Sequence, residues 1–168
     1  MDLPSFVILV TACAPLVDPG TAYALVAVES AFNPHAIGVV GGALDRQPRS
    51  RAAALATTTA LQATGWNFSV GLGQINVRNL PRLGLTVEQA FDPCANLLAM
   101  QRLLTDCFER ASLKAHAPQV ALRRALSCYY SGNFVTGFRE GYVHRVLRAL
   151  DSPAVRPQPA LPHTKESS

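Results

Sequence analysis

The chain has 168 residues, of which 49% are hydrophobic and only 15% are charged, and its formal net charge is +4. This length and composition are typical of a single folded domain. The positive charge suits an anionic partner, such as a cell-wall polymer or a membrane surface. Aromatic residues make up only 7% and no block of five or more Lys or Arg residues occurs, so the composition argues against nucleic-acid binding.

The N-terminal segment allows two interpretations. Residues 6–14 (FVILVTACA) form an apolar run as long as the core of a signal peptide, and residues 10–13 resemble a lipoprotein cleavage box. Asp2 is the only charge before this run, so the basic start of a signal peptide is absent. We therefore favour an ordinary first helix over residues 4–14. No run of about 18 apolar residues occurs, so no membrane-spanning helix is predicted.

The next segments predict two helices separated by a loop. Asp18-Pro19 is a favourable N-cap and first-turn pair, and the helix that follows ends at Asn33-Pro34. Residues 38–50 are rich in glycine and contain a proline, so we predict a loop with a short hairpin that pairs residues 39–40 with residues 43–44. Residues 51–64 are rich in alanine and precede Gly65, which predicts a helix with a glycine stop.

The C-terminal half has further helix starts. Residues 86–89 (TVEQ) form a capping box, Asp92-Pro93 begins a long helix, Pro118 begins another, and the apolar residues of 142–150 mark the last. From residue 152 onward, four prolines in a polar segment indicate disorder. The sequence therefore predicts one mainly helical domain over residues 1–150 with a small β element, and a disordered tail over residues 151–168.

The cysteines and histidines show no metal-ligand spacing. Buried thiols or one to two disulfides are all compatible with the cysteines, and three complete pairings remain open. The cysteines are Cys13, Cys94, Cys107 and Cys128. We interpret the scattered histidines as surface residues, so no metal or cofactor is predicted; they are His35, His116, His144 and His163. A nucleophilic pair of Cys128 with His144 or His116 is conceivable, but nothing local distinguishes Cys128 from the other cysteines.

A single glutamate lies on the inward face of the helix that begins at Asp18-Pro19. Ala22, Leu25, Val26 and Glu29 have the spacing of one apolar helix face. Burial and the negative end of the helix dipole both raise the pKa of a carboxyl group there. A carboxyl protonated near neutral pH suits a general acid. The alternative is a structural glutamate that pairs with an arginine or accepts backbone N–H groups.

A standard glycosidase places a second carboxylate opposite the first. Most other acidic residues lie at helix caps, at exposed helical positions or in the tail. Only Asp45, in the glycine-rich loop, could approach Glu29, and a loop acid is more often simply solvated. If the chain is a glycosidase, one carboxyl group does most of the work.

Two further segments allow ligand contact. Residues 71–75 (GLGQI) let the backbone approach a ligand closely and offer the Gln74 amide, although a tight loop explains them equally well. Residues 129–133 (YYSGN) end a helix at Gly132. Tyr129 lies on the inward stripe of that helix, so its hydroxyl needs a buried partner. An ordinary core role is the alternative for Tyr129.

Residues 29–36 (ESAFNPHA), 71–75 (GLGQI) and 129–132 (YYSG), followed by Tyr142, form an ordered set. The set resembles the soluble-lytic-transglycosylase family of lysozyme-like proteins, whose pattern contains E-S-x-x-x-P-x-A, G-L-x-Q-I and A-Y-N-x-G segments and a late tyrosine. The segments AIGVVGG, FDPCAN and SCYYSGNF are closer to its VirB1-like branch, which cleaves peptidoglycan for type IV secretion and conjugation machines. The resemblance covers roughly residues 3–150.

This resemblance implies an α+β lysozyme-like fold without a cofactor and a catalytic role for Glu29. Glu29 would protonate the oxygen between N-acetylmuramic acid and N-acetylglucosamine. It would then accept the proton of the muramic C6 hydroxyl, which closes on C1 and leaves a 1,6-anhydro end. Because no water enters, no second carboxylate is required.

The resemblance also implies a set of substrate-binding residues. Tyr129 is expected to hydrogen-bond near Glu29, and Tyr142 to help close the site. Tyr130 stands where the family has asparagine, so no sugar-binding role is carried over to it. The expected set is Ser30, Gly71, Leu72, Gln74, Ile75, Tyr129 and Tyr142.

The implied partners are peptidoglycan glycan strands and other components of a type IV secretion or conjugation apparatus. The implied location is the periplasm or cell envelope of a Gram-negative bacterium. Two alternatives remain open: a lysozyme that hydrolyses the same bond, and a non-catalytic wall-binding scaffold subunit in which Glu29 is vestigial.

Overall fold

The computed structural model describes residues 2–115 and 117–152, and these form a mainly helical domain with a small sheet. This confirms the predicted fold class. The last described helix ends at Leu150, while nearly all of the predicted disordered tail lies outside the described residues. Among the described residues, no helix combines the length and the apolar character that crossing a membrane requires.

The first two helices begin as their sequences predict. Helix α1 (Leu3–Cys13) begins after Asp2, whose carboxylate accepts a hydrogen bond from the Ser5 backbone N–H. Helix α2 (Pro19–Ser30) begins in the same way, because Asp18 accepts from the Thr21 N–H at 2.9 Å. Asp as N-cap and Pro in the first turn are therefore sufficient to fix both starts.

The end of α2 depends on two residues in the left-handed region of backbone space. Ala31 has a φ of 48° and Phe32 a φ of 62°. The Phe32 ring packs on Phe6 of α1 and on Tyr23 of α2, with centroid distances of 5.2 Å and 4.7 Å. This aromatic cluster fixes the turn that follows Glu29, even though the backbone conformation is unfavourable for residues other than glycine.

The sheet corrects the predicted hairpin. Strand β1 (Ile37–Val39) pairs antiparallel with β2 (Phe68–Val70), and β2 pairs with β3 (Ile75–Asn76). The predicted pairing of residues 39–40 with residues 43–44 is wrong, because the partner of β1 lies beyond helix α3 (Arg51–Ala63). In the loop before α3, the Gln47 amide instead exchanges two 2.9 Å hydrogen bonds with the Ile37 backbone, as a neighbouring strand would.

Short helical turns connect the sheet to the longest helix. They are η1 (Val77–Asn79), α4 (Leu80–Leu83) and η2 (Gln89–Phe91). The predicted capping box is confirmed, since Thr86 and Gln89 exchange reciprocal backbone–side-chain bonds, although only a 3₁₀ turn follows it. Helix α5 (Pro93–Ser112) then begins at Asp92, as predicted.

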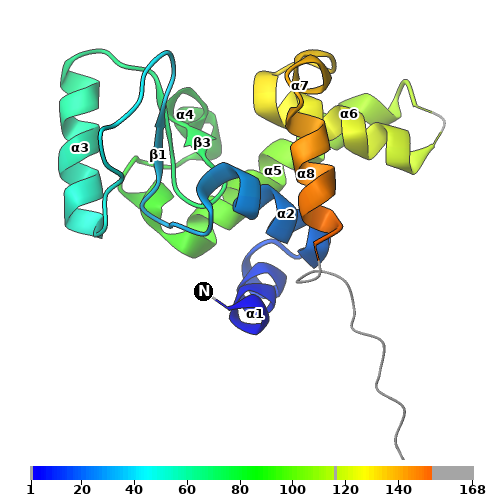
Figure 1. Cartoon of the computed structure of the whole chain (residues 1–168), viewed down its shortest axis with the longest axis horizontal. Coiled ribbons are helices and arrows are strands. Elements are labelled where there is room, and N and C mark those ends of the chain that lie inside the picture. Colours follow the sequence, from blue (N-terminus) through cyan, green and yellow to red (C-terminus); the bar gives the residue numbers. More distant parts are fainter. Residues whose placement is uncertain (1, 116, 153–168) are drawn as a thin grey trace, which may run out of the picture.

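The remaining helices form one side of the molecule. Helices α6 (Pro118–Ser131), α7 (Thr136–Arg139) and α8 (Tyr142–Leu150) follow α5. Figure 1 shows α5 in the middle, with α3 and the sheet on the left and α6, α7 and α8 on the right. Helix α5 packs against α6, and α2 packs against α8. The arrangement therefore has two sides joined by α5 and α2.

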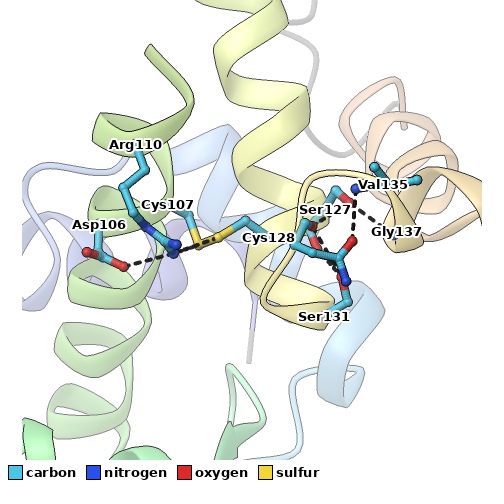
Figure 2. Close-up of a disulfide and its surroundings, with 9 residues drawn as sticks. Asp106, Cys107, Arg110, Ser127, Cys128, Ser131, Val135 and Gly137 are labelled. Atoms are coloured by element: carbon cyan, nitrogen blue, oxygen red, sulfur yellow. Dashed lines mark hydrogen bonds and ion pairs between the residues drawn. A yellow bond between two sulfur atoms is a disulfide. The ribbon is translucent and has the colours of Figure 1, made fainter. Parts of the chain in front are cut away.

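Two disulfides select one of the three pairings that the sequence left open. Cys13 of α1 bonds to Cys94 at the start of α5, and Cys107 of α5 bonds to Cys128 of α6. Figure 2 shows the second bridge, with the Arg110 guanidinium 3.0 Å from the Cys128 sulfur. No cysteine among the described residues is free. The alternative of a nucleophilic Cys128, which the sequence did not favour, is therefore excluded in this oxidised form.

Candidate active site

A cleft of about 520 Å³ lies between the sheet side and the α6–α7 side of the molecule. Glu29 lines this cleft, and both sides of the molecule contribute polar side chains to it. A cleft of this volume lies within the usual range of ligand-binding clefts. Its lining residues are Glu29, Gly38, Val39, Val40, Ser69, Gln74, Asn76, Asn79, Leu103, Tyr129, Tyr130, Ser131, Thr136 and Glu140.

Glu29 lies in the last turn of α2 and is partly buried. Its carboxylate accepts a hydrogen bond of 2.5 Å from the hydroxyl of Tyr142, the first residue of α8. Burial raises the pKa of Glu29 to about 7, while the Tyr142 hydrogen bond and the Arg145 charge act in the opposite direction. The carboxyl group can therefore both donate and accept a proton near neutral pH.

The tyrosine that contacts Glu29 differs from the one expected. Tyr129 lines the cleft, but its hydroxyl donates to the Gly73 carbonyl at 2.5 Å. The expected hydrogen bond of Tyr129 at Glu29 is therefore not formed, and the hydroxyl that contacts the Glu29 carboxyl is that of Tyr142. Both tyrosines face the inside at this point, so the helical period alone could not separate them. Tyr142 reaches Glu29 because α8, which begins at Tyr142, packs directly on α2.

The loop over residues 71–74 is held on its buried side by the side-chain amide of Asn96. Asn96 accepts a hydrogen bond from the Gly73 N–H at 2.7 Å and donates to the carbonyls of Val70 and Ala90. Gly71 has a φ of +78°, and a Cβ atom there would lie 2.2 Å from the Asn96 amide nitrogen. Glycine is therefore required at this point by both the backbone conformation and the close approach.

Gln74 faces the cleft, yet its amide N–H groups are already used. The Gln74 Nε2 donates to the Ala36 and Gly71 carbonyls at 3.1 Å and 3.0 Å. Its Oε1 lies 2.6 Å from the point where a Cβ atom of Gly38 would sit, so a side chain at Gly38 would displace it. Gln74 thus ties the loop to Ala36, the residue before β1, and leaves Oε1 as the atom able to accept from a ligand.

The other expected residues take different places. Leu72 and Ile75 are buried in the core and are not among the cleft-lining residues, so their side chains support the loop from beneath. Ser30 lines a neighbouring hollow of about 310 Å³, which shares Glu29 and Gln74 with the cleft. The Ser30 hydroxyl donates to the Val26 carbonyl one turn earlier.

Sequence reasoning missed three residues around the site: Asn96, Tyr130 and Glu140. Glu140 is the second acidic residue that lines the cleft, whereas Asp45 is exposed and is not among the lining residues. The segment FDPCAN contains Asn96, but only the tertiary structure reveals its three bonds. Glu140 lies two residues before Tyr142, which was already expected at the site, and this closeness in sequence could have indicated Glu140 as a cleft residue.

The family model described as "Transglycosylase SLT domain" matches residues 6–145. The chain belongs to this family. The match includes Glu29, the loop over residues 71–75, and the segment that carries Tyr129, Tyr130 and Tyr142. The family resemblance inferred from the sequence is therefore confirmed, while the individual roles of the site residues stay predictions. No solved structure gives a significant match.

The chain is also similar to proteins named virB1. It is 51% identical over 152 residues to the type IV secretion system protein virB1 of Brucella abortus, which covers 87% of this chain and 64% of that protein. It is 39% identical over 139 residues to the protein virB1 of Agrobacterium fabrum, which covers 82% of this chain and 56% of that protein. The chain therefore spans less than two-thirds of the length of these relatives.

Proposed function

We propose that this SLT-family chain is a peptidoglycan lytic transglycosylase. The proposed reaction cleaves the β-1,4 bond between N-acetylmuramic acid and N-acetylglucosamine. The observation that carries the proposal is the Glu29 carboxyl group, which has a pKa of about 7 and lies in an open cleft under the Tyr142 hydroxyl. A proton donor with this pKa is what cleavage of a glycosidic bond at neutral pH requires.

In the proposed reaction, protonated Glu29 gives its proton to the glycosidic oxygen as the bond from that oxygen to C1 breaks. The resulting carboxylate then accepts the proton of the muramic C6 hydroxyl while O6 bonds to C1. The products are a free 4-hydroxyl group and a 1,6-anhydro end, and Glu29 ends protonated as it began. No water is consumed, so the atoms balance without a second reactant.

The surroundings of Glu140 support a mechanism with one carboxylate. Glu140 also lines the cleft, but its two carboxylate oxygens accept from the Tyr130 hydroxyl at 2.9 Å and from the Arg139 guanidinium at 3.3 Å. Each oxygen that could activate a water molecule therefore already accepts one hydrogen bond. We therefore favour the anhydro product over hydrolysis.

The biological setting follows from the relatives. Since two of them carry the name virB1 and one is named a type IV secretion protein, we propose that the chain opens the wall locally for such an apparatus. Two disulfides are consistent with an oxidising compartment such as the periplasm.

Digestion of purified peptidoglycan, followed by mass spectrometry of the released fragments, tests this function. We expect fragments that end in 1,6-anhydro-N-acetylmuramic acid, each one water lighter than the hydrolysis product. Glu29→Gln keeps the shape of the side chain but cannot transfer the proton, so its rate should fall by about 10²–10⁴-fold.

Glu88→Gln is a matched control, because Glu88 is an exposed glutamate whose carboxylate pairs with Arg51 away from the cleft. It should digest at the wild-type rate. Reducing ends would identify a hydrolase, and no release at all would favour the wall-binding scaffold. A Glu29→Gln variant with more than a tenth of the wild-type rate would remove Glu29 from the mechanism.

A further inference from the structure

Tyr130 presents an aromatic ring to the cleft, at the position where the family pattern has asparagine. Its side chain lines the cleft and is 41% exposed. We propose that Tyr130 and the Glu140 carboxylate form a sugar-stacking subsite beside Glu29, specific to chains with this tyrosine. The inference rests on the proposed function, because it assigns a place in the cleft to one ring of a glycan strand.

The Tyr130 ring is held in a fixed orientation. It stacks on the Tyr142 ring, with a centroid distance of 4.4 Å and an angle of 17° between the planes. The Tyr142 ring therefore covers one face of the Tyr130 ring, while Tyr130 as a whole remains 41% exposed. The Tyr142 hydroxyl also donates to Glu29. Tyr142 therefore lies between the Tyr130 ring and the proposed proton donor and contacts both.

The second member of the subsite, Glu140, is positioned by the contact of α7 with α6. Figure 2 shows the Ser127 hydroxyl oxygen at the Gly137 backbone, where it accepts from the N–H at 3.0 Å. A Cβ atom at Gly137 would lie 2.6 Å from the Ser127 Cα, so only glycine allows this approach. Glu140 follows directly after α7, and its carbonyl accepts from the Arg145 guanidinium at 3.1 Å.

The chemistry of this pair matches one face of a pyranose ring. A pyranose has an apolar face of C–H groups and a rim of hydroxyl groups. An aromatic ring can cover the apolar face, while a carboxylate at the edge of that ring accepts from the rim. Because the Tyr130 hydroxyl donates to Glu140 at 2.9 Å, the two groups keep a fixed relative position before any ligand arrives.

Binding of a tetrasaccharide of alternating N-acetylglucosamine and N-acetylmuramic acid, measured by calorimetry, tests the subsite. All proteins carry Glu29→Gln, so that the sugar is not cleaved. We expect an added Tyr130→Ala to weaken binding about threefold to tenfold, and Tyr130→Phe, which keeps the ring, to stay within about twofold. Phe138→Ala is the matched control, because Phe138 is 45% exposed but is not among the cleft-lining residues.

The alternative is that Tyr130 only braces Tyr142. In that case Tyr130→Ala would bind the tetrasaccharide as tightly as its parent, and this result overturns the inference. Equal weakening by Phe138→Ala would also overturn it. If Tyr130→Ala does not fold, the aromatic NMR signals of the Glu29→Gln parent are followed while the tetrasaccharide is added. The Tyr130 signals should shift, and unshifted Tyr130 signals would refute the subsite. A parent that binds no tetrasaccharide overturns the proposed function as well.

Discussion

The protonation state of Glu29 results from three opposing influences. Burial raises the pKa of its carboxyl group, whereas the Tyr142 hydroxyl and the Arg145 guanidinium lower it, and the balance is about 7. Arg145 acts without direct contact, since it lies over the Tyr142 ring at 5.8 Å from the centroid. The Tyr142 hydroxyl and the Arg145 charge can each be removed by one substitution, and either change should raise the pKa of Glu29.

We expect Tyr142→Phe to move the pH dependence of cleavage upward. Losing the hydroxyl removes an influence that lowers the pKa of Glu29, so the carboxyl stays protonated to higher pH. The descending limb of the kcat/KM profile, near pH 7 in the wild-type protein, should therefore shift to higher pH. Tyr129→Phe is the matched control, because that hydroxyl donates to Gly73. Superimposable limbs for Tyr142→Phe and the wild-type protein would contradict this assignment.

The same carboxyl should make stability depend on pH. In the unfolded chain its pKa returns to about 4.5, while in the folded protein it is about 7. Between these values only the folded state holds the proton, so wild-type stability falls as the pH rises from about 4.5 to about 7 and then levels off. Above pH 7 we expect Glu29→Gln to be more stable than the wild-type protein by up to about 3 kcal/mol.

Urea denaturation at intervals between pH 4 and pH 9 measures this difference. It should shrink towards zero near pH 4, where the carboxyl is protonated in both states. A stability difference that does not change with pH would mean that Glu29 titrates at its ordinary pKa in the folded protein.

At the scale of elements, the loop between β2 and β3 brings the two sides of the cleft together. Its backbone is held by Asn96 of α5 from below, and its Gly73 carbonyl accepts from Tyr129 of α6. A Cβ atom at Gly73 would lie 3.0 Å from the Tyr129 hydroxyl and 3.1 Å from the Met100 Cβ, so the loop fits closely between these helices. The position of Gln74 in the cleft depends on this fit.

We expect Asn96→Ala to lower both stability and activity. The change leaves the Gly73 N–H and two carbonyl groups without buried partners, which should reduce the free energy of unfolding by about 3 kcal/mol. Movement of the loop should reduce kcat/KM by about 10–100-fold. Chemical denaturation and digestion rates measure the two effects.

Gln89→Ala is a suitable control for Asn96→Ala. It removes the capping bond to the Thr86 N–H at an exposed position, so it should cost about 1 kcal/mol and leave kcat/KM unchanged. If Asn96→Ala retained wild-type activity despite its lower stability, Asn96 would be a purely structural residue.

The residues at the helix N-termini were sufficient to predict where helices begin, but the sequence did not predict which strands pair. Asp18-Pro19 and Asp92-Pro93 fix their helices through bonds within three residues, so the sequence alone was sufficient. The partner of β1 lies beyond α3, and strands of two or three residues are too short to show an alternating pattern. For the same reason Glu29 was identifiable from its helix face, whereas its hydrogen-bond donor was not.

At the scale of the whole molecule, disulfides fasten helices that are distant in sequence. Cys13 and Cys94 are 81 residues apart, and their bond joins α1 to the start of α5. A crosslink over a loop of this length restricts the unfolded chain strongly. Cys107 and Cys128 are 21 residues apart and fix α6, which carries Tyr129 and Tyr130, against α5.

We expect the double variant Cys13→Ala, Cys94→Ala to lose about 4 kcal/mol of unfolding free energy. Because neither cysteine is among the cleft-lining residues, kcat/KM at 25 °C should remain close to the wild-type value where the variant is folded. Denaturation curves with and without reductant measure the loss. Reductant should destabilise the wild-type protein more than the variant, and equal destabilisation of both would show that this bridge adds nothing.

The hydrogen bond between Tyr142 and Glu29 joins residues that are 113 positions apart. During synthesis the acid is therefore made early, and its hydroxyl partner emerges only with the last described helix. A nascent or truncated chain that ends before α8 carries Glu29 without the packing of α8 on α2 and without the Tyr130–Tyr142 stack. Under the proposed function this order is a timing safeguard, because Glu29 meets its hydroxyl partner only when nearly all of the described domain has been translated and folded.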